Sequence, residues 1–490
     1  MTSETQVTRA VSPDRRRWLA LALLCVVQFM VVLDIAIVNV ALPSIQVDLG
    51  FSQEDLQWVI SAYALVFGGF LLLGGRAADM LGRRRLFLGG IVVFTVASLF
   101  AGLAWSEASL IGARAFQGLG AAIITPAALS ILSTTFAEGR ERNIALGAWG
   151  AVGGFGAVAG VLLGGVLTDA LSWEWIFFVN VPVGVLGFVL APILLTESRD
   201  ASAKSFDIPG ATLVTGGLVT LVYAITQANG YGWTSIQTIG LFAAAAALLG
   251  AFIVWESRVA EPLVPFSIFR LRTLVGANIA GLILGTASFS MFLMLTLYMQ
   301  QVLGYSAMKT GVSYLAVAGS AILWSAVAAQ VVTRVGVKTA LVIGMTALSA
   351  GLLWFTQVSA NGSYLSDLLP GFLLIAVGLG FSFVPISIAA LAGVQPSEAG
   401  LASGLINTTQ QIGGALGVAA LTAVATSRTD DAIASGSPVP VALTDGFEAA
   451  FIAGTLVALV GILVAIFVVR SKDLARSEER VEAEPLLEAA

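Results

Sequence analysis

The sequence predicts an all-α polytopic membrane protein, in which two six-helix bundles are joined by a two-helix insert. Three observations indicate this fold class: the composition, a series of long apolar stretches and a weak internal repeat. Hydrophobic residues make up 58% and charged residues 11% of the 490 residues. An ordinary soluble domain contains about 25% charged residues, so the composition excludes a soluble protein.

Fourteen stretches are long and apolar enough to be transmembrane helices, each of which needs about 20 mostly apolar residues. They cover residues 18–41, 56–75, 86–105, 109–135, 143–168, 174–196, 210–228, 236–257, 273–301, 308–333, 337–358, 367–393, 399–426 and 447–470.

Basic residues predict the orientation of these helices, because Lys and Arg in short loops are retained on the cytoplasmic side. Of the 24 Lys and Arg, all but Lys309, Arg428 and Arg114 fall in the two tails or in loops after even-numbered spans. We therefore expect both termini to be cytoplasmic. No small-residue cleavage site follows the first apolar stretch, so we expect residues 1–17 to be a retained tail and not a signal peptide.

The internal repeat predicts how the spans are grouped. Residues 49–52, Leu-Gly-Phe-Ser, recur 254 residues later as Leu-Gly-Tyr-Ser at 303–306, and Gly82 aligns with Gly336 at the same offset. Both copies keep the same sidedness, which indicates a parallel repeat. The predicted division is a tail (1–17), a first bundle (18–200), an insert (201–262), a second bundle (263–472) and a tail (473–490).

Asp34 is the only acidic residue that this assignment places deep in the bilayer. A charge at that depth costs roughly 2.5–3.5 kcal/mol on insertion scales, so an ionisable residue there is a functional hypothesis with a partner to be found. The predicted partner is Arg114, which helical spacing places on one face with Gln117 and Gly118. The alternative is a structural arginine that binds backbone carbonyls.

The loop from Gly75 to Arg85 is predicted to act as a conformational latch at the cytoplasmic surface. Gly82 permits a tight turn with positive φ. Asp79 can pair with Arg83 across that turn, and Arg84 adds a second basic group. The alternative is an ordinary basic loop, which would not need the acidic residue.

Small residues in the fifth span predict close contact between helices. Gly156, Gly160 and Gly164 lie near one face and are followed by Gly165. Close packing is a main source of helix association in lipid. The contact either slides during transport or packs statically.

The second half has no deep charge, since Ser288 corresponds to Asp34 in the repeat. It offers aromatic side chains instead, and we expect substrate contacts from Asn39 and Gln117 in the first half and from Phe289, Trp324 and Phe381 in the second.

The sequence contains no histidine and a single cysteine, Cys25. Proton chemistry must therefore use carboxylates. There is no phosphate-binding loop, no metal-ligand cluster and no nucleophile with a histidine, so we expect no enzyme, no metal, no cofactor and no nucleic-acid partner. A monomer is expected.

Four patterns carry a resemblance that covers almost the whole chain. They are the Asp34 stretch that ends at residues 39–43, the loop at 75–85, Arg114 with Gln117 and Gly118, and residues 173–184 (Trp-Glu-Trp-Ile-Phe-Phe-Val-Asn-Val-Pro-Val-Gly). With them the sequence resembles the drug:proton antiporter branch of the major facilitator superfamily with fourteen spans, the EmrB/QacA type. The resemblance implies a major facilitator fold and proton-driven export, with Asp34 as the protonation site and Arg114 assisting proton transfer.

Two residues depart from the pattern of that branch. Val161, within the glycine-rich antiporter motif at 156–165, stands where proline is usual, and Glu174 stands where arginine is common.

The expected function is export of a small hydrophobic neutral or monovalent cationic molecule across a bacterial cytoplasmic membrane, with the proton gradient as energy source. Two alternatives remain at this point. One is proton-coupled uptake of a nutrient or ion, because a fold does not fix a function. The other is a membrane sensor or scaffold, but the tail after Arg470 is too short and polar to fold as a partner domain.

Overall fold

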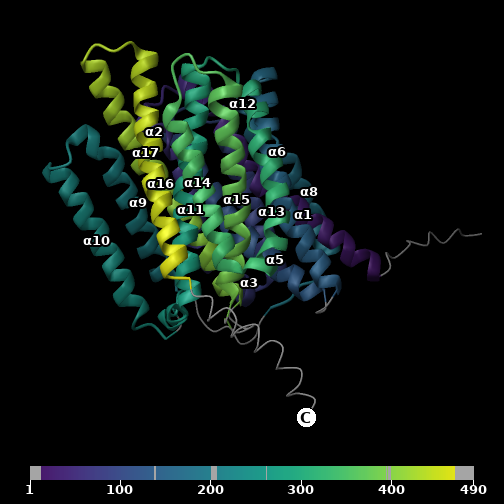
Figure 1. Ribbon diagram of the computed structural model, residues 1–490. Helices are drawn as coiled ribbons and strands as arrows, with labels where there is room; N and C mark the ends of the chain where they lie inside the picture. The colour runs from purple at the N-terminus through teal and green to yellow at the C-terminus, as the bar shows by residue number, and fades with distance from the viewer. Residues whose placement is uncertain are drawn as a thin grey trace, which may run out of the picture.

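The computed structural model describes residues 13–136, 140–199, 207–260, 262–392, 394 and 399–469. Every regular element within these residues is a helix, and the long helices run roughly side by side in one bundle (Figure 1).

The first half contains α1 (Pro13–Leu49), α2 (Gln53–Leu56), α3 (Trp58–Leu81), α4 (Arg83–Gly102), α5 (Glu107–Thr135), α6 (Arg140–Ala170), α7 (Trp175–Phe178) and α8 (Asn180–Leu194). Two helices follow, α9 (Ile208–Tyr231) and α10 (Ile236–Glu256). The second half contains η1 (Phe266–Arg270), α11 (Arg272–Leu297), η2 (Tyr298–Val302), α12 (Ala307–Ser313), α13 (Leu315–Val335), α14 (Val337–Trp354), η3 (Phe355–Gln357), η4 (Tyr364–Leu368), α15 (Leu369–Leu391), α16 (Ala399–Ala434) and α17 (Val439–Phe467).

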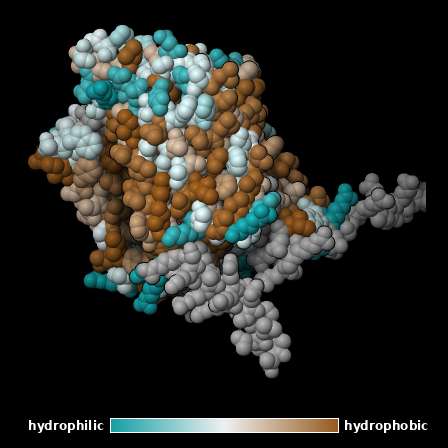
Figure 2. All heavy atoms as spheres, in the orientation of Figure 1, coloured by the Kyte–Doolittle hydropathy of each residue, from teal (hydrophilic) through white to brown (hydrophobic). Residues whose placement is uncertain are grey.

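Each predicted span coincides with a helix, but not every helix is apolar enough to be assigned as a span. Among the described residues, twelve helical segments are long and apolar enough to cross a membrane. The two predicted spans outside this set fall on α6 and α16. Residues 407–411 of α16, Asn-Thr-Thr-Gln-Gln, interrupt its apolar run. The surface in Figure 2 is hydrophobic over the middle of the visible face and hydrophilic towards its two ends, as a bilayer requires.

Equivalent helices of the two halves pack in the same pairs, as a parallel repeat requires. In the first half α1 packs on α6, α3 on α5 and α4 on α5. In the second half α11 packs on α16, α13 on α15 and α14 on α15.

The repeated turns also share their backbone conformation. Gly50 (φ 76°) and Gly304 (φ 64°) both have positive φ, as do Gly82 (φ 109°) and Gly336 (φ 80°). Only glycine adopts this region routinely. The repeated glycines therefore reflect the same two turns, one in each half.

The helical pair α9–α10 lies at one edge of the bundle (Figure 1). Its helices pack on each other, and α9 also contacts α3 of the first half and α16 of the second. Gly69 of α3 allows this approach, because a Cβ at that position would collide with the side chain of Thr215. The pair therefore covers one of the junctions between the halves.

Candidate functional site

The Asp34 carboxylate is fully buried inside the first half and accepts three hydrogen bonds. Arg114 donates from Nη1 to Oδ2 at 2.5 Å. Oδ1 accepts from Nε2 of Gln117 at 3.0 Å and from Nδ2 of Asn180 at 2.8 Å. These donors come from α5 and α8, so three helices meet at one carboxylate.

Arg114 is itself only 2% exposed, and most of its donors have acceptors. Its Nε donates to the backbone carbonyl of Val59 at 2.9 Å, and Nη1 also donates to Oε1 of Gln117 at 2.8 Å. The guanidinium carbon lies 4.4 Å from the ring centroid of Tyr63. Such a desolvated cation–π contact contributes about 2 kcal/mol.

The cluster extends to α4 through a hydroxyl group. Ser98, which is fully buried, accepts from Nε2 of Gln117 at 2.7 Å and from Nδ2 of Asn180 at 3.4 Å. Within the described residues, Oδ1 of Asn180 and the hydroxyl of Tyr63 are buried without a hydrogen-bond partner. The cluster thus has strong donors around Asp34 and two groups beside it that can still accept a hydrogen bond.

Burial makes this ion pair sensitive to the loss of either member. Removing one partner of a buried pair costs about 3–5 kcal/mol, because the other charge is left without compensation. The same sensitivity makes the site responsive to protonation. A proton converts one Asp34 oxygen from an acceptor into a donor, but the three groups that contact this carboxylate are donors themselves. Protonation is therefore incompatible with the contacts as they stand.

The structure brings together Asp34, Arg114 and Gln117, the three residues that the sequence grouped. Both readings of Arg114 hold, since it binds a carboxylate and a backbone carbonyl. Sequence reasoning missed Asn180 and Ser98. An asparagine inside the apolar segment at 173–184 was the available signal for Asn180, whereas a lone serine in a membrane helix gave none.

The glycines of α6 face the helix that carries Asp34. A Cβ added at Gly160 would lie 2.6 Å from Cβ of Ala36 and 2.9 Å from the carbonyl oxygen of Leu33. Gly156 and Gly164 make similar approaches to α1.

The next residue, Gly165, faces the other half instead, because its added Cβ would lie 2.7 Å from Cα of Met308 in α12. Helix α6 therefore contacts both the proton-site helix and the second half. It continues through Val161 as one helix from Arg140 to Ala170, although proline is usual at that position in the resembling branch.

The loop between α3 and α4 turns at Gly82, and its partners lie just after α8. Oε1 of Glu197 accepts from the backbone N–H of Arg84 at 3.1 Å, and its Oε2 lies 3.8 Å from Nε of the same arginine. The backbone N–H of Arg83 donates to the carbonyl of Ser198 at 2.9 Å. The Asp79 side chain, which was expected to pair with Arg83, lies outside the described residues.

One further contact ties this loop to the segment between the insert and the second half. Nη1 of Arg76 donates to the carbonyl of Pro262 at 2.9 Å, in the segment that leads from α10 to α11. Gly75, the first residue of the predicted latch, packs against Pro126 of α5.

The other predicted substrate residues lie apart from the Asp34 cluster in the contacts that the structure describes. Asn39 donates to the carbonyl of Ile35 in its own helix. Phe289 packs against Gly414 of α16, and the rings of Trp324 and Phe381 lie 6.2 Å apart. Their place in a substrate site stays a prediction.

The two halves are hydrogen-bonded to each other at the end of the bundle where α2 and α12 lie, at the top of Figure 1. Nε2 of Gln300 donates to the carbonyl of Val40 at 2.8 Å, and Nε2 of Gln301 donates to Oε1 of Gln46 at 2.8 Å. A hollow of about 650 Å³ beside them is lined by the same glutamines and by Asp48.

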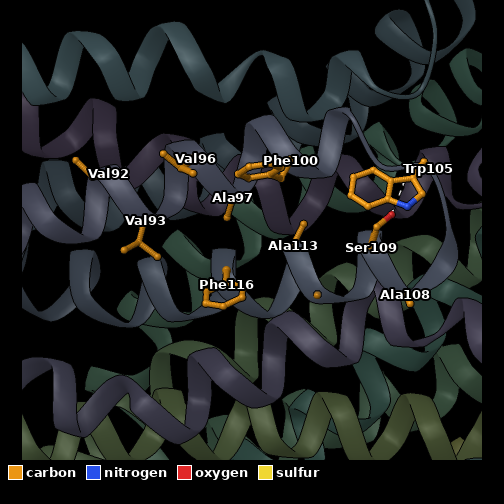
Figure 3. A pocket seen from close by; sticks show the side chains of 11 residues that line it. Val92, Val93, Val96, Ala97, Phe100, Trp105, Ala108, Ser109, Ala113 and Phe116 are labelled. Carbon is orange, nitrogen blue, oxygen red and sulfur yellow. Dashed lines mark hydrogen bonds between the residues drawn. The ribbon is translucent and has the colours of Figure 1, made fainter.

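A second hollow, of about 530 Å³, lies on the outer face of α4 and α5 (Figure 3). Its lining is apolar except for Ser109, whose Oγ accepts from the backbone N–H of Trp105 at 3.1 Å. Phe100 and Phe116 are more than half exposed here. The hollow therefore belongs to the apolar surface. Ala97 and Ala113 of its lining immediately precede Ser98 and Arg114 of the buried cluster in the sequence.

Comparison with known sequences identifies the family. The family described as Major Facilitator Superfamily matches residues 24–418. Puromycin resistance protein pur8 of Streptomyces alboniger is 42% identical over 437 residues, which cover 89% of this chain and 87% of that protein. Cephamycin export protein CmcT of Amycolatopsis lactamdurans is 41% identical over 430 residues, with 86% and 87% covered. The tetracenomycin C resistance and export protein of Streptomyces glaucescens is 35% identical over 417 residues, with 85% and 77% covered.

Solved structures share the fold at low sequence identity. A peptide transporter POT mutant in complex with sulfate has a TM-score of 0.65 at 14% identity and covers 91% of this chain and 94% of that one. A bacterial homologue of the human lysosomal transporter Spinster, in an inward-facing and unoccupied conformation, has a TM-score of 0.65 at 16% identity, with 94% and 98% covered. The family match and the curated relatives, together with this shared helical architecture, show that the chain is a multi-pass membrane transporter that belongs to the Major Facilitator Superfamily.

Proposed function

We propose that this transporter exports small hydrophobic molecules, antibiotics among them, in exchange for protons. The observation that carries the proposal is the buried Asp34 carboxylate, whose hydrogen-bond partners are all donors. The names of the curated relatives support the direction and the substrate class, because they are resistance or export proteins for puromycin, cephamycin and tetracenomycin C.

The proton step follows from the donors around Asp34. A neutral carboxyl has one O–H donor, which needs an acceptor. Oδ1 of Asn180 is a buried acceptor without a partner on an amide that already bonds Asp34, so rotation of that amide would serve the protonated state. As it stands, the amide presents its N–H to the Asp34 carboxylate. After rotation it would present its oxygen to the O–H of the protonated carboxyl. Protonation thus removes the negative charge that pairs with Arg114.

Release of this pair would loosen the contact of α1 with α5 and shift the balance between the two orientations of the halves. The glutamine hydrogen bonds between the halves form the outer gate in this proposal, and the loop at 75–85 with Glu197 forms the inner latch. A ligand or a proton shifts such a balance only through its different affinity for the two states. Here the difference is the buried ion pair, which exists in one protonation state only.

We further propose the finer assignment to the fourteen-span drug:proton antiporter branch, in which α6 and α16 also cross the bilayer. At 31 and 36 residues both helices are long enough. The chain would then lie in a bacterial cytoplasmic membrane with both termini in the cytoplasm and would act without a cofactor. The expected cargo is a neutral or monovalent cationic molecule.

The test is Asp34→Asn in purified protein reconstituted into vesicles. The amide keeps the shape but cannot bind or release a proton, so export of puromycin driven by an imposed pH gradient should fall to the level of empty vesicles. Asp430→Asn is the matched control, because that carboxylate lies exposed on α16. Gradient-driven export by Asp34→Asn at the rate of the control would refute the proposal.

A further inference from the structure

A second pair of buried carboxyl groups lies at the base of the α9–α10 pair. Asp207 is 1% and Glu256 3% exposed. Asp207 is the residue before α9, and Glu256 is the last residue of α10. The two side chains lie close enough to interact electrostatically, and to share a hydrogen bond when one of them carries a proton. Neither carboxyl forms an ion pair with a basic side chain in the part of the chain that the structure describes.

The surroundings of the two carboxyls differ in a way that decides which one is ionised. Oδ1 of Asp207 accepts from the backbone N–H of Gly210 at 2.8 Å and from Nε1 of Trp255 at 2.6 Å. It also caps the N-terminus of α9, where the helix dipole favours a negative charge. Asp207 is therefore well placed as a carboxylate.

Glu256 has the opposite environment. It ends α10, and the C-terminal end of a helix disfavours a negative charge. Both its oxygens and Oδ2 of Asp207 are buried without a hydrogen-bond donor within the described residues. The other groups that approach Glu256 are the backbone amides of Leu263 and Val264. Two adjacent buried carboxylates repel each other, and one proton between them would remove the repulsion and supply the missing donor.

We propose that Glu256 and Asp207 form a second proton-binding site, in which one proton on Glu256 is donated to Oδ2 of Asp207. The site fastens the base of the α9–α10 pair to the segment that leads into the second half. Two basic groups lie in this region: Arg76 of α3 donates to the carbonyl of Pro262, and Arg258 is exposed. Lys204 and Glu261 lie outside the described residues. Loss of the proton would leave two buried negative charges and weaken this fastening.

Infrared spectroscopy tests the proposal by detecting the C=O stretch of a protonated carboxyl at pH 7. The measurement uses the Asp34→Asn protein, so that the transport site cannot contribute, and compares it with the same protein carrying Glu256→Gln. We expect a difference spectrum with one carboxylic-acid band. Absence of that band would overturn the proposal.

A second variant guards against a change caused by misfolding. Asp207→Asn keeps an acceptor for Trp255 and offers an N–H to Glu256, which can then stay ionised, so the same band should disappear. Thermal unfolding gives an independent readout. A proton that is held in the folded state and released on unfolding makes the folded fraction fall as pH rises, by up to tenfold in the unfolding equilibrium per pH unit. The slope should be larger, by up to one proton, in the Asp34→Asn protein than after Glu256→Gln; an identical slope in both would refute the site.

Discussion

Gly160→Ala should disable the transporter by displacing the helix that holds Asp34. The added Cβ would lie 2.6 Å from Cβ of Ala36 and 2.9 Å from the backbone carbonyl oxygen of Leu33. Carbon atoms in contact are normally about 3.5–4.0 Å apart. Relief of the overlap therefore requires α1 or α6 to move by about 1 Å, since no flexible side-chain end lies in the way.

Asp34 lies between these two contact residues and moves with them. A shift of about 1 Å takes the 2.5 Å bond to Arg114 and the 2.8 Å bond from Asn180 beyond good hydrogen-bond geometry. Overpacking costs about 1–3 kcal/mol, and a weakened hydrogen bond to a charged group adds about 1.5–3 kcal/mol. The sum is a destabilisation of roughly 2.5–6 kcal/mol.

The measurement is pH-gradient-driven puromycin export in vesicles, together with the melting temperature of the purified protein. Gly89→Ala is the matched control, because an added Cβ on this glycine of α4 meets nothing within 4 Å. We expect a lower melting temperature and slower export for Gly160→Ala only. Equal melting and equal export in the two variants would show that α6 does not constrain Asp34.

Three further outcomes follow from the site. Asn180→Leu removes the amide that can serve both protonation states, so export should fall at least tenfold, whereas Asn407→Leu, which removes an amide bonded within its own helix, should not reduce it. Glu197→Gln should alter the transport rate without altering which compounds bind, and should change stability by only about 0.2–1 kcal/mol because its ion pairs are partly exposed; a changed binding spectrum would contradict a latch. With one proton exchanged per substrate, a membrane potential imposed at equal pH should drive a neutral compound but not a monovalent cation, and a divalent cation should be a poor substrate; concentration of the monovalent cation would show that more than one proton is exchanged.

The sequence predicted the helical architecture well because its signals are physical requirements of the bilayer. Apolar length located the helices, and the turn predicted at Gly82 has positive φ, as does its counterpart at Gly336. The pairing of Asp34 with Arg114 was also predictable, because a charge deep in a membrane needs a partner.

The rest of the site depends on neighbours that are distant in sequence. Nothing local shows that Ser98 approaches Gln117, or that Glu197 receives Arg84, since both contacts result from how the helices pack. The face of α6 was correctly predicted to make close contacts, but its partner was not: which helix the glycines touch is a property of the folded bundle.

The sequence also underestimated the buried charge, and the reason bears on how many protons the transporter handles. Asp207 and Glu256 fall at predicted span ends, where water or lipid headgroups normally surround a carboxylate. In the structure the packing of α9, α10 and the segment at 262–264 excludes them from solvent. A carboxyl group can therefore be buried, and so favour its protonated form, without lying deep in the bilayer. A count of transported protons that differs from one would not by itself discredit Asp34, but it would direct attention to this second pair, whose titration can be separated from transport by removing the Asp34 carboxyl first.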